Sequence, residues 1–138
     1  MKITLAQINF VVGDIEGNKE KIIAAAQQSK GSSLLIFSEL SLCGFPPYNL
    51  LNYSDFIERC EKAIDEIAER CDTIPLLIGA PVRNTSGKGK PLFNAAVFLH
   101  QGKRQVFKKK NVGLSNYFEP ADETNILQLG CMKVAVTI

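Results

Sequence analysis

The chain has 138 residues, 46% of them apolar and 22% charged, which is the size and composition of one globular domain. A net charge of +2 gives no electrostatic reason to expect nucleic-acid or membrane binding, and no apolar run approaches the roughly 20 residues that span a bilayer. One histidine and four cysteines without paired spacing argue against a zinc site. Because the amino terminus alternates and is unlike a signal peptide, we expect a soluble, cytoplasmic protein.

The first half of the chain predicts alternating strands and helices. A partly alternating apolar segment predicts a strand over residues 3–8, and a helix with one apolar face is expected from Asn18 to about Lys30. The continuous apolar run Leu34–Phe37 is typical of a strand buried on both faces. Ser54 is a candidate cap for a second helix, and Pro75–Gly79 reads as the next buried strand.

The second helix carries apolar residues at steps of three and four, which form one inward stripe: Ile57, Cys60, Ile64, Ile67 and Cys71. The order strand, helix, strand, helix, strand favours parallel pairing through crossover helices.

The rest of the chain has a different character. A polar loop at residues 83–91 precedes a strand at Asn94–Leu99, and a tight turn at Gln101-Gly102 returns the chain as a hairpin partner over Arg104–Lys108. The last expected strand is Lys133–Ile138. Because a natural carboxyl terminus is usually polar and loosely held, we expect that more of the protein follows this apolar run.

The chain has four cysteines, Cys43, Cys60, Cys71 and Cys131, of which Cys60 and Cys71 belong to the inward stripe of the second helix. We expect all four to be reduced, buried thiols with structural roles.

Glu39 is the first candidate for chemistry, because it comes directly after the buried strand that ends at Phe37. The carboxyl edge of an open α/β sheet is where such folds place their sites. A carboxylate between Phe37 and Leu40 is expected to be partly desolvated, which suits a general base. The alternative is a strand-end glutamate that turns to solvent. The stiff segment 44–51, with Pro46-Pro47, either holds this carboxylate in place or only connects it to the second helix.

Five of the eight residues from Lys103 to Lys110 are basic. The simplest interpretation is a solvated hairpin edge that lysines protect against aggregation. Nucleic-acid contact is the second possibility, but no second basic cluster or aromatic platform accompanies the run. The third is an inward lysine: strand alternation puts Lys109 on the same face as Phe107, so Lys109 is the inward candidate.

These segments resemble a known family. KITLAQINFVVGDIEGNKEKI resembles the first strand, loop and helix of the carbon–nitrogen hydrolase (nitrilase) superfamily, and LLIFSELSLCGFPPYNLL resembles its glutamate motif. PLLIGAPV, LFNAAVFLHQGKRQVFKKK and NYFEPA follow in the family's order. The Gly-aromatic-Pro-Pro continuation with Leu-Leu is similar to the glutaminase domain of glutamine-dependent NAD synthetases. The resemblance covers essentially the whole chain.

The resemblance implies an α/β fold, the nitrilase-like αββα four-layer sandwich, of which residues 1–138 are an incomplete, N-terminal portion. It also implies a Glu-Lys-Cys triad. In that triad Glu39 is the general base and Lys109 stabilises the oxyanion, with Lys108 and Lys110 as alternatives for the lysine. The nucleophilic cysteine is expected just after Ile138, so this portion alone is expected to be inactive.

The implied activity is hydrolysis of glutamine to glutamate and ammonia. Beyond residue 138 we expect an ATP-dependent synthetase domain that uses the ammonia to amidate deamido-NAD. Glutamine is then the partner of this portion, and deamido-NAD, ATP and Mg²⁺ are partners of the intact protein. No cofactor or metal is expected in residues 1–138, and the intact protein is expected to be a homo-oligomer.

The chain departs from the family's pattern between Lys109 and Tyr117. This segment is several residues short, and Val112-Gly113 stand where the family has a Leu-Pro step. Either the loop is deleted or residues are missing from the sequence, and the well-matched flanks favour omission. The family's second glutamate and part of its glutamine-binding loop fall in the missing piece.

Two other functions remain open at this point. One is a free-standing amidase of another small amide, and the other is a non-catalytic protein that keeps the nitrilase fold. A pyrophosphate-binding loop beyond residue 138 would support the synthetase over the free-standing amidase. A cysteine after Ile138 would support an enzyme, and alanine or serine there a non-catalytic relative.

Overall fold

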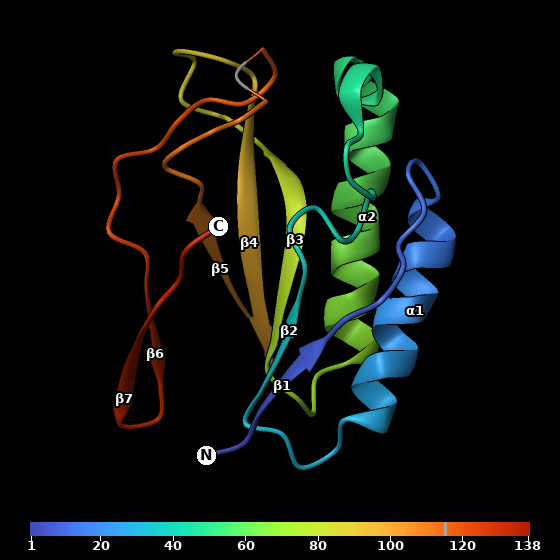
Figure 1. Cartoon of the computed structure of the whole chain (residues 1–138), viewed down its shortest axis with the longest axis vertical. Coiled ribbons are helices and arrows are strands. Elements are labelled where there is room, and N and C mark those ends of the chain that lie inside the picture. The colour runs from blue at the N-terminus through green and yellow to red at the C-terminus, as the bar shows by residue number, and fades with distance from the viewer. Residues whose placement is uncertain (115) are drawn as a thin grey trace.

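In the computed structural model, residues 1–114 and 116–138 are described, and they form a sheet with two long helices against it (Figure 1). The elements in chain order are β1 (Ile3–Ala6), α1 (Ile15–Gln28), β2 (Leu34–Phe37), the short 3₁₀ helix η1 (Tyr48–Asn52), α2 (Ser54–Arg70), β3 (Leu76–Arg83), β4 (Leu92–His100), β5 (Lys103–Lys108), β6 (Ile126–Leu129) and β7 (Met132–Ala135).

The main sheet has five strands in the order β1-β2-β3-β4-β5, so each strand lies beside its neighbours in sequence. β1, β2 and β3 pair in parallel through the crossover helices α1 and α2, as the alternation of elements predicted. β3, β4 and β5 pair antiparallel. The turn between β4 and β5 is at Gln101 and Gly102, both with positive φ, which confirms the expected tight hairpin.

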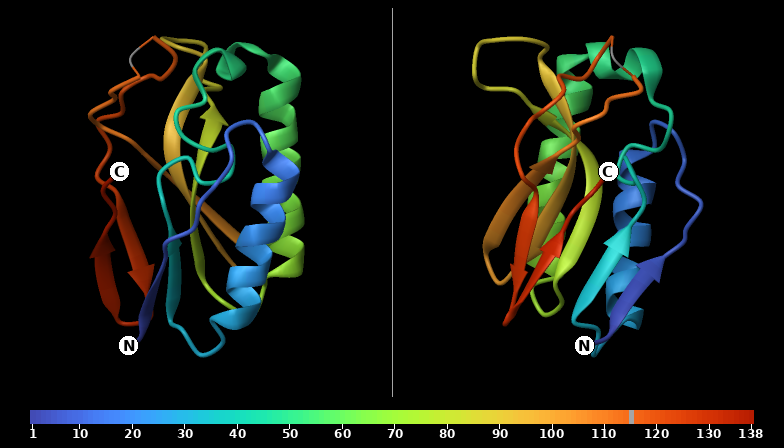
Figure 2. Two further views of the ribbon diagram at one scale, coloured as in Figure 1. Left: turned by 45° about the vertical axis from the view of Figure 1, so that its right-hand side comes forward. Right: turned by 60° about the vertical axis from the view of Figure 1, so that its left-hand side comes forward.

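The two faces of the sheet are covered by different layers (Figure 2). α1 and α2 lie on one face, where their apolar stripes pack on β2, β3 and β4 in the larger core cluster. The β6–β7 hairpin lies on the other face, and its Leu127 packs in a second cluster with Leu34, Leu77 and Phe107. The order helix layer, sheet, partial second sheet corresponds to three of the four layers of the expected αββα sandwich. None of the described helices is long and apolar enough to span a membrane.

The first helix begins earlier than predicted. α1 starts at Ile15, and its cap is Asp14, whose side chain accepts a hydrogen bond from the Gly17 N–H at 3.0 Å. Asn18, the predicted start, is inside the helix and fully buried. Its side-chain amide forms hydrogen bonds with the backbone of Val11 and Leu42, so this polar residue makes a tertiary contact inside the helix.

The predicted cap of α2 is also wrong. Ser54 is the first helical residue, and Tyr53 is the cap, without a side-chain hydrogen bond. The predicted inward stripe of α2 is confirmed, because Ile57, Cys60, Ile64 and Ile67 are all buried.

The last part of the chain differs most from the prediction. The expected strand over Lys133–Ile138 is shorter and earlier, at Met132–Ala135, and most of its residues are exposed. Its partner β6 was not predicted, since Ile126–Leu129 is short and only Leu127 in it is buried. The two strands depend on each other for backbone hydrogen bonds, which a local sequence pattern does not reveal.

Candidate active site

Glu39 lies in a tight turn directly after β2. The turn closes through the Ser41 N–H, which donates to the Ser38 carbonyl at 3.2 Å, and Leu40 adopts a left-handed φ of 50°. Ser41 also ties the turn to the neighbouring strand, since its hydroxyl accepts from the Gly79 N–H at 3.2 Å. The carboxylate therefore stands on a backbone that β3 holds in place.

Gly79 makes this arrangement possible. A Cβ atom built on Gly79 would lie 2.4 Å from both the Leu40 nitrogen and the Ser38 oxygen, and 2.8 Å from the Glu39 carbonyl carbon. Real Cβ atoms essentially never approach other atoms so closely. The absence of a side chain at this position of β3 thus leaves the space in which the Glu39 turn sits.

The three consecutive lysines after β5 have three different partners. Lys108 pairs with Glu123 and Lys110 with Asp122, both at the surface. Lys109 alone points inward, and its Nζ lies 2.7 Å from Oε1 of Glu39. The structure therefore places the inward lysine at Lys109 and not at either neighbour, and it brings together the two site residues that the sequence singled out.

A third side chain in this cluster was missed at the level of sequence. Asn94 in β4 is 3% exposed, and its Nδ2 donates to Oε1 of Glu39 at 2.6 Å. Its backbone carbonyl accepts from the Lys109 N–H at 2.8 Å. The available signal was an asparagine inside the otherwise apolar strand Leu92–Leu99, where a buried amide needs a polar partner.

Glu39 lines two cavities. One, of about 190 Å³, also contacts Gly44 and Phe45, so the stiff segment does lie beside the carboxylate. The other, of about 260 Å³, lies between the sheet and the last residues of the chain, and Ile138 lines it together with Glu39. Ile138 and Glu39 are therefore close to each other in space, on the walls of one cavity.

The thiols of the chain divide into two kinds. Cys43, Cys60 and Cys71 are buried as expected, and burial raises the pKa of each, that of Cys60 to about 12. These three are protonated at neutral pH and are poor nucleophiles. Cys131 contradicts the expectation of a buried thiol, because it is exposed in the turn between β6 and β7. That turn lies at the end of the molecule where β1 begins, whereas Glu39 follows the carboxyl end of β2 (Figures 1 and 2).

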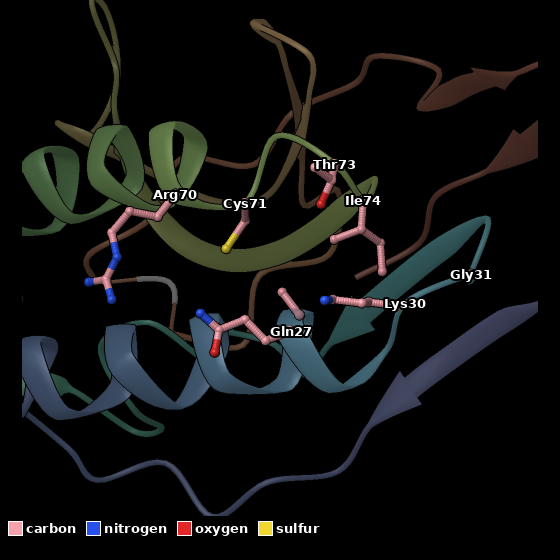
Figure 3. Close-up of a pocket in the computed structure, with 8 residues that line it drawn as sticks. Gln27, Lys30, Gly31, Arg70, Cys71, Thr73 and Ile74 are labelled. Atoms are coloured by element: carbon pink, nitrogen blue, oxygen red, sulfur yellow. The ribbon is translucent and has the colours of Figure 1, made fainter.

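A separate cavity of about 310 Å³ lies between the carboxyl ends of α1 and α2 (Figure 3). Gln27 in α1 and Lys30 just after it line one side of the cavity, and Cys71 and Ile74, which follow α2, line the other. Arg70 at its edge is engaged by Glu20. The residues around this cavity do not include Glu39, Asn94 or Lys109, so it is distinct from the candidate active site.

The cluster is suited to proton transfer at Glu39 and to charge stabilisation at Lys109. Oε1 of Glu39 receives two hydrogen bonds, whereas none of the described residues donates to Oε2. An ionised carboxylate with one such oxygen can take a proton there. The Lys109 side chain is 14% exposed, and its ammonium group can stabilise an oxyanion that forms beside it. Within residues 1–114 and 116–138, no group of three or more His, Cys, Asp or Glu side chains could hold a metal ion.

Comparison with known proteins identifies the family. Residues 2–136 match the carbon–nitrogen hydrolase family, which is nearly the whole chain. The chain belongs to this family. Among curated carbon–nitrogen hydrolase relatives, the glutamine-dependent NAD(+) synthetase of Aquifex aeolicus is 35% identical over 149 positions that cover 100% of this chain and 25% of the relative. That of Synechocystis is 36% identical, covering 99% of this chain and 27% of the relative.

Solved structures agree with this membership. The glutamine-dependent NAD+ synthetase of Acinetobacter baumannii, in complex with ADP, superposes with a TM-score of 0.88 at 28% identity over 98% of this chain and 27% of that one. An amidase from Nesterenkonia shares the fold with a TM-score of 0.81 at 20% identity, over 99% of this chain and 54% of that one. This carbon–nitrogen hydrolase chain thus spans about a quarter of the length of its NAD synthetase relatives.

The alignment with the Aquifex relative is longer than this chain. It extends over 149 positions, whereas this chain has 138 residues, so at least 11 positions of the alignment are empty in this chain. Ser115, in the segment that is short by comparison with the family, lies outside the described residues. On its carboxyl side the chain returns to the sheet, where the Glu119 N–H donates to the Leu92 carbonyl at 2.8 Å.

Proposed function

We propose that residues 1–138 are the first part of the glutamine-hydrolysing domain of a glutamine-dependent NAD synthetase. The observation that carries this proposal is the ion pair of 2.7 Å between Glu39 and Lys109 at the carboxyl edge of the sheet, in a chain whose similarity to NAD synthetases extends over its full length. A glutamate base and a lysine that stabilises an oxyanion are two of the three groups of a Glu-Lys-Cys amidase.

The proposed reaction begins with proton transfer from a cysteine thiol to Oε2 of Glu39. The thiolate attacks the side-chain carboxamide carbon of glutamine, and the Lys109 ammonium stabilises the oxyanion that forms. Glu39 then returns its proton to the leaving nitrogen, and ammonia departs with a thioester left on the sulfur. Water, deprotonated by Glu39, hydrolyses the thioester to glutamate and regenerates the thiol.

The nucleophilic cysteine is proposed to follow Ile138 directly. Two observations support this position. Ile138 and Glu39 line the same cavity of about 260 Å³. None of the buried thiols Cys43, Cys60 and Cys71 lines either of the two cavities that Glu39 lines. A residue after Ile138 is therefore better placed to meet Oε2 of Glu39 than any of these three.

The intact protein is proposed to carry a second, ATP-dependent domain beyond residue 138. Ammonia from glutamine passes to that domain, which uses ATP and Mg²⁺ to activate deamido-NAD and amidate it to NAD. The support is the length of the relatives, of which this chain covers about a quarter. We expect the intact enzyme to be a cytoplasmic homo-oligomer.

The test of this function is Glu39→Gln in the full-length protein. The amide cannot accept the thiol proton, so we expect glutamine turnover to fall by at least about 100-fold. Glutamine should still bind, because the substitution keeps the size of the side chain. Release of glutamate and ammonia measures turnover, and isothermal titration calorimetry measures binding.

Glu123→Gln is the matched control, since Glu123 pairs with the neighbouring Lys108 at the surface. It should leave turnover within about two-fold of the unsubstituted protein. Normal turnover of Glu39→Gln would remove Glu39 from the mechanism, and absence of glutamine hydrolysis in the unsubstituted protein would refute the proposed function itself.

A further inference from the structure

We infer that Asn94 is a positioning residue that aligns Glu39 with Lys109. The inference rests on the proposed function, because it concerns the geometry of the base and the oxyanion-stabilising lysine. Asn94 acts through these two residues and not on the substrate.

Asn94 contacts both members of the pair, with two different groups. Its side-chain Nδ2 donates to Oε1 of Glu39 at 2.6 Å, and its backbone carbonyl accepts from the Lys109 N–H at 2.8 Å. One residue of β4 thus connects the turn after β2 with the segment after β5. Any rotation of the carboxylate away from Lys109 breaks the Asn94 bond as well.

The hydrogen bond from Asn94 also decides which carboxylate oxygen is free. Asn94 in β4 and Lys109 just after β5 both donate to Oε1. Two donors on the same oxygen fix the plane of the carboxylate and direct Oε2, to which no described residue donates, away from them. Without Asn94 the Lys109 ammonium alone would hold the carboxylate, and a single ion pair permits rotation about the last side-chain torsion.

Asn94 is poorly explained as a purely structural residue. Its side-chain Oδ1 is buried and has no hydrogen-bond partner among the described residues. A buried polar atom without a partner lowers the stability of a fold, and an apolar residue of similar shape avoids that cost. Its neighbours in β4 are apolar, namely Phe93, Ala95, Ala96 and Val97. Asn94 is the single polar residue in this run, and its side chain donates its hydrogen bond to Glu39, the proposed base.

The test compares Asn94→Leu with the unsubstituted full-length protein. Leucine keeps the approximate volume of the side chain and removes both the donor and the unpaired Oδ1. We expect a melting temperature equal to or above that of the unsubstituted protein, with kcat for glutamine hydrolysis lower by about 100-fold and KM within about three-fold. A structural role alone would instead lower stability and activity together.

Asn94→Asp provides the second variant. It has the same shape as asparagine, but its ionised carboxylate repels Glu39 and does not donate to it. At pH 8 we expect its kcat to be as low as that of Asn94→Leu, so the inference stays testable if leucine disturbs the fold. Val97→Ala, a cavity-forming change in the same strand, should lower the melting temperature and leave kcat within about two-fold.

The outcomes separate this inference from the proposed function. If Glu39→Gln abolishes turnover while folded Asn94→Leu or Asn94→Asp keeps the normal kcat, Asn94 does not position the base and the inference is wrong. A variant with normal kcat and a raised KM would also overturn it, in favour of a substrate contact. If Glu39→Gln itself retains turnover, the proposed function fails first.

Discussion

The two carboxylate oxygens of Glu39 have unlike surroundings. Oε1 is held by Asn94 at 2.6 Å and Lys109 at 2.7 Å, and no described side chain donates to Oε2. Because the held oxygen is already an acceptor in two hydrogen bonds, a proton arriving at the carboxylate goes to Oε2. In the proposed mechanism the same atom returns the proton to the leaving nitrogen, and this geometry suits a group that acts first as a base and then as an acid.

Gly79→Ala should displace the Glu39 carboxylate indirectly, through the backbone of the turn that carries it. The new Cβ would lie 2.4 Å from the backbone of Ser38 and Leu40, so the turn that carries Glu39 must move. We expect a loss of about 1–3 kcal/mol in the free energy of unfolding, measured by urea denaturation. Gly113→Ala is the control, because its Cβ would meet no atom within 4 Å, and equal stability of the two variants would contradict the prediction.

At the level of residues, the sequence predicted two of the three groups in the cluster. Glu39 was recognisable by its place after a buried strand, and Lys109 by strand alternation with Phe107. The choice of Lys109 over Lys108 and Lys110 still needed the structure, which gives each lysine its own carboxylate. Asn94 was missed because its partner is 55 residues away in the chain, a distance that local patterns do not span.

The start of α1 depends on one side chain. Asp14 accepts a hydrogen bond from the Gly17 N–H, which otherwise has no partner in the first turn. Asp14→Ala should therefore lower the free energy of unfolding by about 1 kcal/mol. Asp14→Asn keeps the capping oxygen and should stay within a few tenths of a kcal/mol of the unsubstituted protein by urea denaturation. A similar loss for both variants would show that the cap does not act through this hydrogen bond.

The contact between α1 and α2 includes a buried lysine with a pH-dependent contribution. Lys19 donates to Glu16 and Glu66, and these hydrogen bonds raise its pKa above the ordinary 10.5. A raised folded-state pKa means that the stabilisation is complete below pH 10.5 and is lost as the pH rises through the folded value. The stability difference between the unsubstituted protein and Lys19→Met should thus be constant from about pH 7 to 9 and shrink above about pH 10.5.

Lys62→Met is the control for this prediction. Lys62 pairs with Glu58 on the exposed face of α2, where 69% of its side chain is accessible, so its loss should change stability little at neutral pH. If the Lys19→Met difference is the same at pH 11 as at pH 8, the ion pairs of Lys19 do not contribute to stability.

At the level of elements, the sequence predicted those that a strong local pattern defines. β2 is a continuous apolar run and α2 has a regular inward stripe, and both are where they were expected. The predictions failed where a contact between residues far apart in the chain determines the local structure. Asn18 was predicted as the start of the first helix but lies inside it and binds Leu42 across the core, and β6 is a strand because β7 pairs with it.

The molecule as a whole leaves part of its sheet uncovered on the side of the β6–β7 hairpin. Leu5 in the edge strand β1 is 74% exposed and Ile3 is 42% exposed. Exposed apolar side chains on an edge strand promote association with other chains. That other residues of the same protein cover this face stays a prediction.

Residues 1–138 expressed alone should therefore show no glutamine hydrolysis. None of their buried thiols lines either cavity that Glu39 lines, and their exposed thiol, Cys131, is in the turn between β6 and β7. Release of ammonia is measured against the full-length protein, and circular dichroism verifies that the shorter chain is folded. Turnover that disappears in Cys131→Ser would show that the nucleophile is in this portion after all.

Glu39 and Lys109 are separated by 70 residues in the chain, and they meet only when β2, β3, β4 and β5 are assembled in one sheet. β5 is at the edge of the described sheet and is hydrogen-bonded to β4 alone. Edge strands detach at a lower free-energy cost than the core unfolds. Each such detachment separates Lys109 from Glu39. We therefore expect glutamine turnover to be lost at a temperature some degrees below the melting temperature of the protein.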